Sequence, residues 1–440
     1  MKENILGTEK ISKLFISFSI PAIIAMVIAG MQVMIDGVFV ANFVGINAMA
    51  SVNIAQPFFQ LTIAVGMMIS VGSLSFMGRS LGAKDINKTQ NIFRTSLTAL
   101  VIMAIILTIA GFFFSENIAI LLGSSEVLLK DSSTYIKFIS IFILPMFFVY
   151  QFGFSNRLVG KPDLYFKGMI LSVIANIILN YILINVLQLG TMGAAIATGL
   201  SCSLALLVVV WPQIDRKNVI NIFVGKYDKT TIIPVIYNGA SEGIASIAGG
   251  IVAYIFNTAF MQVAGEAGVA AFTTINYIAL FGTYIMFGIG DGIGPIISYN
   301  YGSGRLDRVK KILNISYIVS IIVGVVIALV LFIFGENIVR IFTGSNTEVI
   351  ELAVMGGRVY AAAFLINGIN IINSAYFTCI GFARESVIIA LSRSLIFIVI
   401  GVIIIPKAFG INGIWMSVPF AEIITLVITY FLFRKMRVEN

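Results

Sequence analysis

Long apolar segments recur along the chain and are separated by short polar segments. Each apolar segment reaches about 20 residues or more, the length that an α-helix needs to cross a bilayer core. The pattern predicts an all-α integral membrane protein with twelve transmembrane helices. We place the spans at 14–43, 51–78, 92–114, 134–156, 168–187, 192–212, 232–260, 271–300, 312–334, 352–380, 387–406 and 411–433.

The charges of the segments between these spans alternate along the chain. Of the 28 Lys and Arg residues, 23 fall on one side, Arg157 and Arg393 among them, and the other side holds Lys130, Lys137, Arg340, Arg358 and Lys407. Positively charged loops stay in the cytoplasm during insertion. We therefore predict a multi-pass protein of the inner (cytoplasmic) membrane with both termini in the cytoplasm. This topology accounts for the net charge of +8, so we expect no nucleic-acid partner.

Composition excludes a water-soluble protein. The chain is 59% hydrophobic and 11% charged, whereas soluble domains carry about 25% charged residues. It contains no His, so any proton handling falls to carboxylates. Cys202 and Cys379 lie far apart in apolar segments, a pattern typical of small core residues and not of a disulfide or metal pair.

The second half of the sequence repeats the first at an offset of 220 residues. Because each repeat holds an even number of spans, the halves share one orientation. We predict two six-helix bundles related by a pseudo-twofold axis along the membrane normal. The predicted organisation is an N-terminal lobe at 1–212, a cytoplasmic linker at 213–231 and a C-terminal lobe at 232–440. The matches include Glu116-Asn117-Ile118 with Glu336-Asn337-Ile338, and glycines 30, 45, 72 and 82 with glycines 250, 265, 292 and 302.

Four acidic residues fall inside the predicted spans: Asp36, Glu242, Asp291 and Glu422. A charge at the centre of a membrane helix costs about 2.5–3.5 kcal/mol on insertion scales, so we expect each of these acids to have a structural or functional role. A carboxyl group kept from water can exchange a proton or hold a sodium ion, and either event can bias an inward–outward equilibrium. Asp36 is the strongest candidate, since it follows Pro21, which can bend the first span. A hydrogen bond between helices is the alternative role for each acid.

Polar side chains form stripes on two spans. Asn176 and Asn180 share one face of span five. Asn367, Asn370 and Asn373 share a face of span ten, where we favour hydrogen bonding between helices. We class Asp291, Glu422 and Asn370 as weaker candidates for the substrate cavity or for coupling, since Asp291 has glycines on both sides and can satisfy exposed backbone instead.

Several motifs resemble those of the multidrug and toxic compound extrusion (MATE) family. They are Pro21 with Asp36, the glycine-rich ends of spans two and eight, and the segments Gly193–Thr198, Gly265–Phe272 and Pro295–Gly302. The resemblance covers nearly the whole chain and is strongest to the bacterial DinF/MepA-like branch. It implies drug efflux driven by entry of protons or sodium ions through a two-lobed bundle of twelve helices.

The resemblance also implies roles for individual residues. Asp36 matches the aspartate of the first helix that is associated with cation coupling, and Pro21 matches the bending proline. Asn176 and Thr198 match polar residues of the amino-lobe network, and Glu242 is similar to a glutamate of helix seven in another branch. Two departures stand out: Asn180 replaces an Asp of many relatives, and span ten carries no acid to partner Glu242. We assign ion coupling to Asp36, Asn176, Asn180, Thr198 and Glu242, with Asp36 also able to hold Na⁺.

These observations predict a secondary active antiporter that exports cationic, aromatic organic compounds in exchange for H⁺ or Na⁺ by alternating access. We expect it to work as a monomer in the lipid bilayer, without a cofactor. The alternative is a flippase for lipid-linked precursors, whose anionic headgroup would call for several Arg or Lys inside the cavity. A carrier of the major facilitator type is less well supported, because the similar loop Gly78–Gly82 is short and unspecific. A membrane-embedded enzyme would need a catalytic cluster and a channel would need a filter loop, and neither is evident.

Overall fold

The structure is a computed structural model that describes residues 4–343 and 347–439, and the elements in these ranges are helical. The first half contains α1 Ile5–Thr8, α2 Ile11–Phe43, α3 Ile46–Gly82, α4 Ile86–Phe113, α5 Ser115–Leu121, α6 Glu126–Ser140, α7 Ile143–Leu158, α8 Asp163–Asn180, the π-helical turn η1 Tyr181–Val186, α9 Gly190–Val209 and α10 Trp211–Ile214. The second half contains α11 Lys229–Asn238, α12 Ala240–Gly302, α13 Leu306–Thr343, α14 Thr347–Ile380, α15 Ala383–Leu391, the π-helical turn η2 Ser392–Ile396, α16 Phe397–Ile404, α17 Pro406–Phe409 and α18 Ile411–Glu439.

The helices account for the twelve predicted spans. In the described ranges, ten helical segments are long and apolar enough to cross a membrane, and the pair α6 and α7, bent by 49°, makes an eleventh. The twelfth arises because α12 forms two membrane spans. Its 63 residues would extend about 95 Å if straight, far beyond the thickness of a bilayer.

Gly265 divides α12 into two spans. Its backbone has φ 60° and ψ −150°, a conformation that residues with a side chain rarely adopt. The segment before it belongs to predicted span seven, and the segment after it to span eight. The prediction of twelve helices in two bundles is therefore confirmed.

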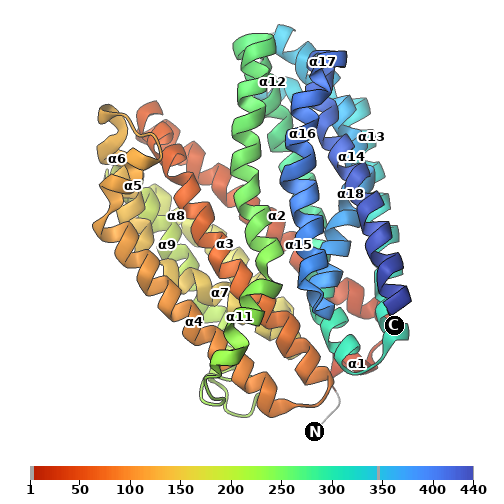
Figure 1. The fold of residues 1–440 in the computed structure, drawn as a ribbon. Coiled ribbons are helices and arrows are strands. Elements are labelled where there is room, and N and C mark those ends of the chain that lie inside the picture. Colours follow the sequence, from red (N-terminus) through yellow and green to blue (C-terminus); the bar gives the residue numbers. More distant parts are fainter. Residues whose placement is uncertain (1–3, 344–346, 440) are drawn as a thin grey trace.

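The helices gather into two lobes, one from each half of the chain (Figure 1). Helices α3 to α9 lie on the left of this view, α12 to α18 lie on the right, and α2 runs obliquely between them. The lobes meet at the end of the molecule that carries both chain termini. At this end Ser75 of α3 donates its hydroxyl hydrogen bond to the carbonyl oxygens of Thr378 (2.6 Å) and Cys379 (3.1 Å) on α14.

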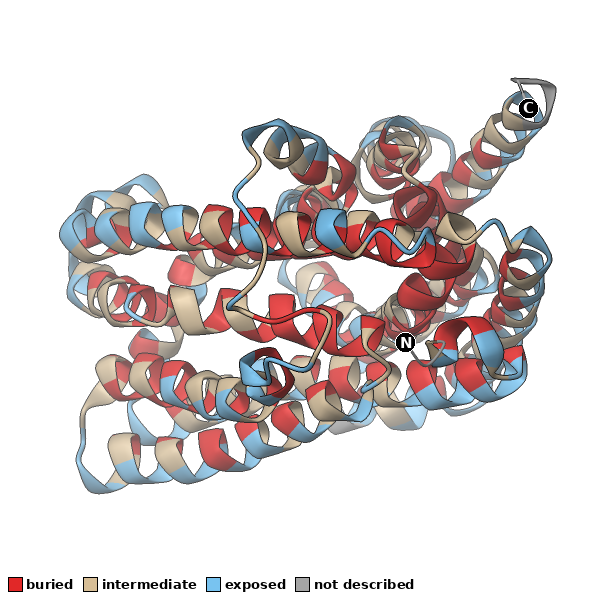
Figure 2. Ribbon diagram, turned by 90° about the horizontal axis from the view of Figure 1, so that it is seen from below, coloured by how far each residue is buried: buried red, intermediate tan, exposed pale blue. Residues whose placement is uncertain are grey.

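The first described residues of the chain pack between the two lobes at the end that carries the termini. Seen from the side of the termini, they lie near the middle of the face (Figure 2). Leu6 of α1 is fully buried. Asn4 donates from Nδ2 to the carbonyl oxygen of Leu158 in the first lobe (2.8 Å), while Asn300 of the second lobe donates to the carbonyl oxygen of Leu6 (2.9 Å). Residues 4–9, which we call the N-terminal strap, thus bond to both lobes.

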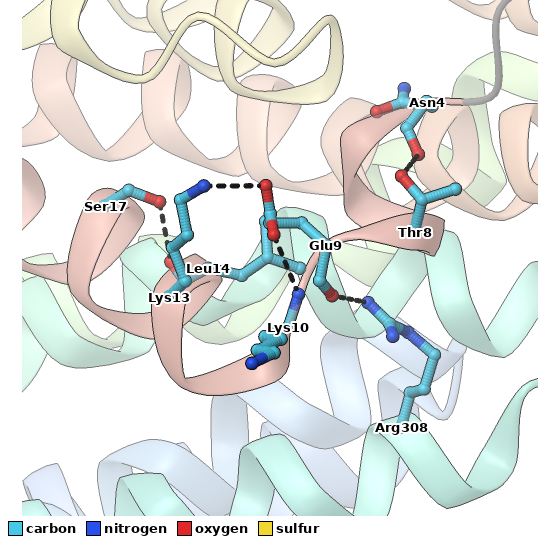
Figure 3. A network of polar contacts seen from close by, with 8 residues as sticks. All are labelled: Asn4, Thr8, Glu9, Lys10, Lys13, Leu14, Ser17 and Arg308. Atoms are coloured by element: carbon cyan, nitrogen blue, oxygen red, sulfur yellow. Dashed lines mark hydrogen bonds and ion pairs between the residues drawn. The ribbon is translucent and has the colours of Figure 1, made fainter.

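Glu9 ends the strap just before α2 begins. Arg308 of α13 donates from Nη2 to the Glu9 carbonyl oxygen at 2.7 Å, and the Lys13 ammonium pairs with the Glu9 carboxylate at 2.8 Å (Figure 3). The same ammonium holds the pKa of Glu9 below its usual value. These contacts tie the start of the first span to the second lobe.

The lobes diverge away from the end with the termini. Figure 1 shows their helices spreading apart toward the opposite end of the molecule. No heavy atom lies within 4 Å of the point where a side chain would begin at Gly37 of α2 or at Gly249 and Gly250 of α12, so no residue of the other lobe packs against these positions. The structure is therefore closed at the end with the termini and open at the other.

Candidate functional site

Asp36 lies at the centre of a hydrogen-bonded group in the first lobe. The two amides of α8, Asn176 and Asn180, donate from Nδ2 to Asp36 Oδ1 at 2.9 Å and 2.6 Å. The spacing of four residues puts both amides on one face of α8, as the sequence predicts. Both amides are fully buried, whereas Asp36 itself is half-buried.

Thr198 of α9 completes this group. Its hydroxyl donates to Asp36 Oδ2 at 2.9 Å, while Asn180 also donates to Asn176 Oδ1 at 3.2 Å. Helices α2, α8 and α9 therefore meet through one carboxylate. We call Asp36, Asn176, Asn180 and Thr198 the amino-lobe site. Sequence analysis predicts all four of its members as ion-coupling residues, and the structure brings them together.

The chemistry of the amino-lobe site suits exchange of a single positive charge. Every observed bond donates to Asp36, which is the pattern expected of an ionised carboxylate. The site also contains amide and hydroxyl oxygens, and Asn180 Oδ1 is buried without a hydrogen-bond partner in the described structure. Rotated amides would present oxygens to a cation, and the Thr198 hydroxyl can turn to accept a hydrogen bond from the protonated carboxyl group of Asp36.

The backbone is irregular in the helices that carry the polar side chains. α8 passes directly into the π-helical turn η1 after Asn180, and single π-helical turns of this kind are frequent at functional sites. The fifth span of the other lobe contains the second π-helical turn, η2, which carries Arg393. Pro21 lies inside α2, which runs from Ile11 to Phe43 as one helix without a break, so the predicted bend does not interrupt the span.

Glu422 occupies a second polar centre, in the other lobe. It is nearly fully buried on α18. Asn367 and Asn370 of α14 each donate from Nδ2 to one of its carboxylate oxygens at 2.7 Å, and Arg393 Nη2 lies 3.4 Å from Oε1. Asn373 accepts a hydrogen bond from Tyr317 of α13. The predicted bonding of the span-ten stripe between helices is confirmed, and the structure assigns Glu422 and Asn370 to this ion-paired group.

Arg393 is buried inside the second lobe, which differs from the sequence prediction. We placed it among the positive residues at the cytoplasmic side, but it is 9% exposed within the eleventh span and pairs with Glu422. Its place inside the predicted span 387–406 was the signal that could have identified it.

Glu242 and Asp291 lie apart from the amino-lobe site, on the two halves of α12. Both line a small cavity in the second lobe together with Arg393. Asp291 is approached from the first lobe by Arg157, the last charged residue of α7. The Arg157 guanidinium donates to the Asp291 carbonyl oxygen at 3.2 Å and lies 3.8 Å from its carboxylate. The structure thus separates Glu242 from the other predicted ion-coupling residues.

Arg157 is a second residue that sequence reasoning placed wrongly. We expected it in a cytoplasmic loop, but it is 2% exposed, stacked near Phe154 and Tyr165 at the lobe interface. It directly follows predicted span 134–156, where hydropathy alone does not distinguish a loop from a buried helix end. Among the described residues, Arg157 and Arg393 are the buried arginines, and each lies beside a carboxylate.

The described residues contain no group of three or more His, Cys, Asp or Glu side chains arranged to hold a metal ion. A sodium ion at the amino-lobe site would rely on one carboxylate with amide and hydroxyl oxygens. Cys202 and Cys379 are both free thiols.

Comparisons with known proteins span both lobes. A family model described as MatE matches residues 21–182 and 244–403, which include Asp36, Asn176 and Asn180. The multidrug export protein MepA of Staphylococcus saprophyticus is 26% identical over 96% of this chain and 94% of that protein. MepA of Staphylococcus aureus is 26% identical over 97% of this chain and 95% of that protein. A solved structure described as the outward-facing conformation of a multidrug resistance MATE family transporter superimposes with a TM-score of 0.92 at 22% identity, covering 100% of this chain and 98% of that one.

Proposed function

The chain belongs to the MatE family and is MepA-like over nearly its whole length, and from this we propose that it is a multidrug efflux antiporter of the inner membrane. It exports cationic, aromatic organic compounds, and entry of H⁺ or Na⁺ drives each cycle. The carrier alternates between a state open at one end and a state open at the other. No cofactor takes part, and one chain suffices.

The amino-lobe site is the observation that carries this proposal. Asp36 is held by three donors from two other helices, so a change in its charge alters bonds to α8 and α9 together. When a cation neutralises Asp36, the attraction between its carboxylate and these three donors weakens. The helices then repack, which couples ion entry to the shape of the lobe.

The balance of interior charges supports cationic cargo. The spans contain four acids, Asp36, Glu242, Asp291 and Glu422, against two buried arginines. In the part of the chain that the structure describes, both of these arginines lie beside carboxylates, so their charges are compensated and not free for a pyrophosphate headgroup. This arrangement disfavours the flippase alternative.

The direction of transport follows from the orientation that the positive residues predict. With both termini in the cytoplasm, the closed end faces the cytoplasm and the open end faces outward. The structure then corresponds to the state that releases drug and accepts the coupling ion from outside.

Purified protein in liposomes tests the proposal. Uptake of ethidium into these liposomes is measured under a proton gradient and, separately, under a sodium gradient. We expect uptake with one of the two gradients and its loss in Asp36→Asn. Asp163→Asn is the matched control, because Asp163 is an exposed carboxylate at the start of α8, paired only with Lys167. Equal uptake by Asp36→Asn and the native protein would overturn the proposal, as would scrambling of lipid-linked sugars without dye transport.

A further inference from the structure

The last turn of α14 ends at the lobe interface, at the end of the molecule that carries the termini. The final carbonyl groups of a helix have no partner within it, so they need donors from elsewhere. The loop that follows supplies two, since Gly381 and Phe382 donate their backbone N–H groups into the last turn at 3.1 Å and 2.9 Å. The last two carbonyl groups, those of Cys379 and Ile380, accept from side chains of the first lobe.

Both side chains come from α3. Ser75 and Arg79 are four residues apart, so they lie on one face of this helix. The Ser75 hydroxyl lies between the carbonyl oxygens of Thr378 and Cys379, at 2.6 Å and 3.1 Å. Arg79 donates from Nη1 to the carbonyl oxygen of Ile380 at 3.4 Å. A helix of the first lobe therefore caps the end of a helix of the second lobe.

The charge of Arg79 suits this position. Its guanidinium lies 4.5 Å above the ring of Phe76, and its Nε donates to the carbonyl oxygen of Ser75 at 3.3 Å. A cation beside the last turn of a helix is stabilised by the partial negative charge of the carbonyl groups there. Gly381 leaves room for the guanidinium, because a Cβ atom on this residue would stand 2.1 Å from Arg79 Nη1.

The matching helix end of the first lobe is capped in the same way. α7 ends at Leu158, and Gly160 follows with φ 78°, as Gly381 follows α14 with φ 91°. The carbonyl oxygen of Leu158 accepts a hydrogen bond from Asn4 of the N-terminal strap at 2.8 Å. The strap is itself bonded to the second lobe. In both repeats, a side chain from outside the lobe thus caps the end of the fourth span.

We call Ser75, Arg79 and the carbonyl groups of residues 378–380 the interlobe cap. We propose that the interlobe cap stabilises the state closed at the end with the termini, and that Ser75 and Arg79 set the ratio of closed to open molecules. The inference rests on the alternating access of the proposed function, to which it adds the contacts that must break at this end. When the lobes part, both side chains leave α14 and water takes their place on the carbonyl groups. Because water replaces the lost bonds, opening has only a moderate cost and the carrier can still cycle.

Loss of either side chain should favour the open state. Ser75→Ala removes the hydroxyl that bonds to α14, and the net contribution of one neutral hydrogen bond predicts a fall of about fivefold in the ratio of closed to open molecules. Arg79→Met removes a charged donor, for which we expect a fall of about tenfold or more. Arg79→Lys keeps the positive charge but not the fork of donors, so its ratio should lie between those of Arg79→Met and the parent.

Distances between spin labels measure the ratio. Labels on Lys88→Cys of α4 and Lys310→Cys of α13, both exposed near the closed end, report separation of the lobes in a protein with Cys202→Ser and Cys379→Ala. The exchange of Cys379 leaves its backbone carbonyl in place, so this parent protein retains the interlobe cap. Closed molecules give the short distance, and we expect its population to fall in the order parent, Ser75→Ala and Arg79→Met.

Matched controls come from the same end of the molecule. Ser80 is a buried serine of α3 whose hydroxyl donates to the carbonyl oxygen of Phe76 in its own helix, so Ser80→Ala should follow the parent. Arg384 is an exposed cation at the start of α15, and Arg384→Met should do the same.

The inference is overturned if Ser75→Ala and Arg79→Met keep the ratio of the parent, or if Ser80→Ala lowers it as much as Ser75→Ala does. Ser75→Ala decides the question if Arg79→Met does not fold, because it removes a single hydroxyl group. Either of these contrary results leaves the proposed function intact as long as the native protein exports dye under an ion gradient. Absence of gradient-driven export by the native protein would instead reject the proposed function.

Discussion

Gly82 and Gly302 lie at matching positions of the two repeats, and each rests against the backbone of the opposite lobe. A Cβ atom on Gly82 would stand 2.0 Å from the carbonyl oxygen of Tyr299, and one on Gly302 would stand 2.1 Å from the carbonyl oxygen of Arg79. Arg79 and Tyr299 are themselves 220 residues apart. The pseudo-twofold axis therefore passes between the ends of α3 and α12, where the lobes close.

Gly82→Ala should open this contact. The added methyl group cannot fit against a backbone oxygen, and overpacking of this kind costs about 1–3 kcal/mol. Because the cost falls only on the closed state, we expect the ratio of closed to open molecules to drop by about 5–150-fold. The spin labels on Lys88→Cys of α4 and Lys310→Cys of α13, both exposed near the end with the termini, measure this ratio as a short-distance population in a protein with Cys202→Ser and Cys379→Ala. Gly250→Ala, at a helical position with open space around it, is the control and should leave the distribution unchanged.

Asn180→Ala should weaken ion coupling without disturbing the fold. The variant removes the 2.6 Å bond to Asp36, and a hydrogen bond to a charged group contributes about 1.5–3 kcal/mol. The loss makes the ionised form of Asp36 less stable, so we expect drug-stimulated proton or sodium exchange to shift by roughly tenfold or more in ion concentration. Asn42→Ala provides the comparison, since Asn42 is exposed and bonds only to the backbone of its own helix. An unchanged ion dependence in Asn180→Ala would contradict a role in coupling.

The Arg393–Glu422 pair should matter for stability more than for coupling. Arg393→Met leaves Glu422 buried and uncompensated, a change that costs about 3–5 kcal/mol. We expect a clear fall in the thermal unfolding midpoint in detergent, and recovery when Glu422→Gln is added. Arg340→Met, in an exposed pair with Glu336, is expected to change stability by less than about 1 kcal/mol. If the double variant unfolds as early as Arg393→Met, the ion-pair explanation is wrong.

Leu6→Asp should release the N-terminal strap. Leu6 is fully buried between the lobes, so a carboxylate there either loses its hydration or forces the strap out. We expect the closed population to fall and export to slow. Ile5→Asp is the adjacent control, because Ile5 is 42% exposed and tolerates the charge. Identical behaviour of the two variants would show that the strap does not hold the lobes together.

Local sequence patterns were sufficient for the spans, the repeat and the shared face of Asn176 and Asn180. Apolar runs give the twelve spans because a bilayer demands a minimum helix length. The spacing of Asn176 and Asn180 places them on one face, since helical periodicity is a property of the chain itself. The link from that face to Asp36 and Thr198 came from the resemblance of the motifs to those of the MATE family, and the structure adds the distances.

Only the tertiary structure decided which charges are buried and which lobe holds them. Arg157 and Arg393 look like residues of positive loops because hydropathy averages over a window and ignores what packs against a side chain. Their burial depends on Asp291 and Glu422, which are 134 and 29 residues away in sequence. Closure at one end, the strap and the cavity beside Glu242 likewise depend on how the two lobes are docked. No local pattern encodes that docking, because the contacts that create it join residues from opposite halves of the chain.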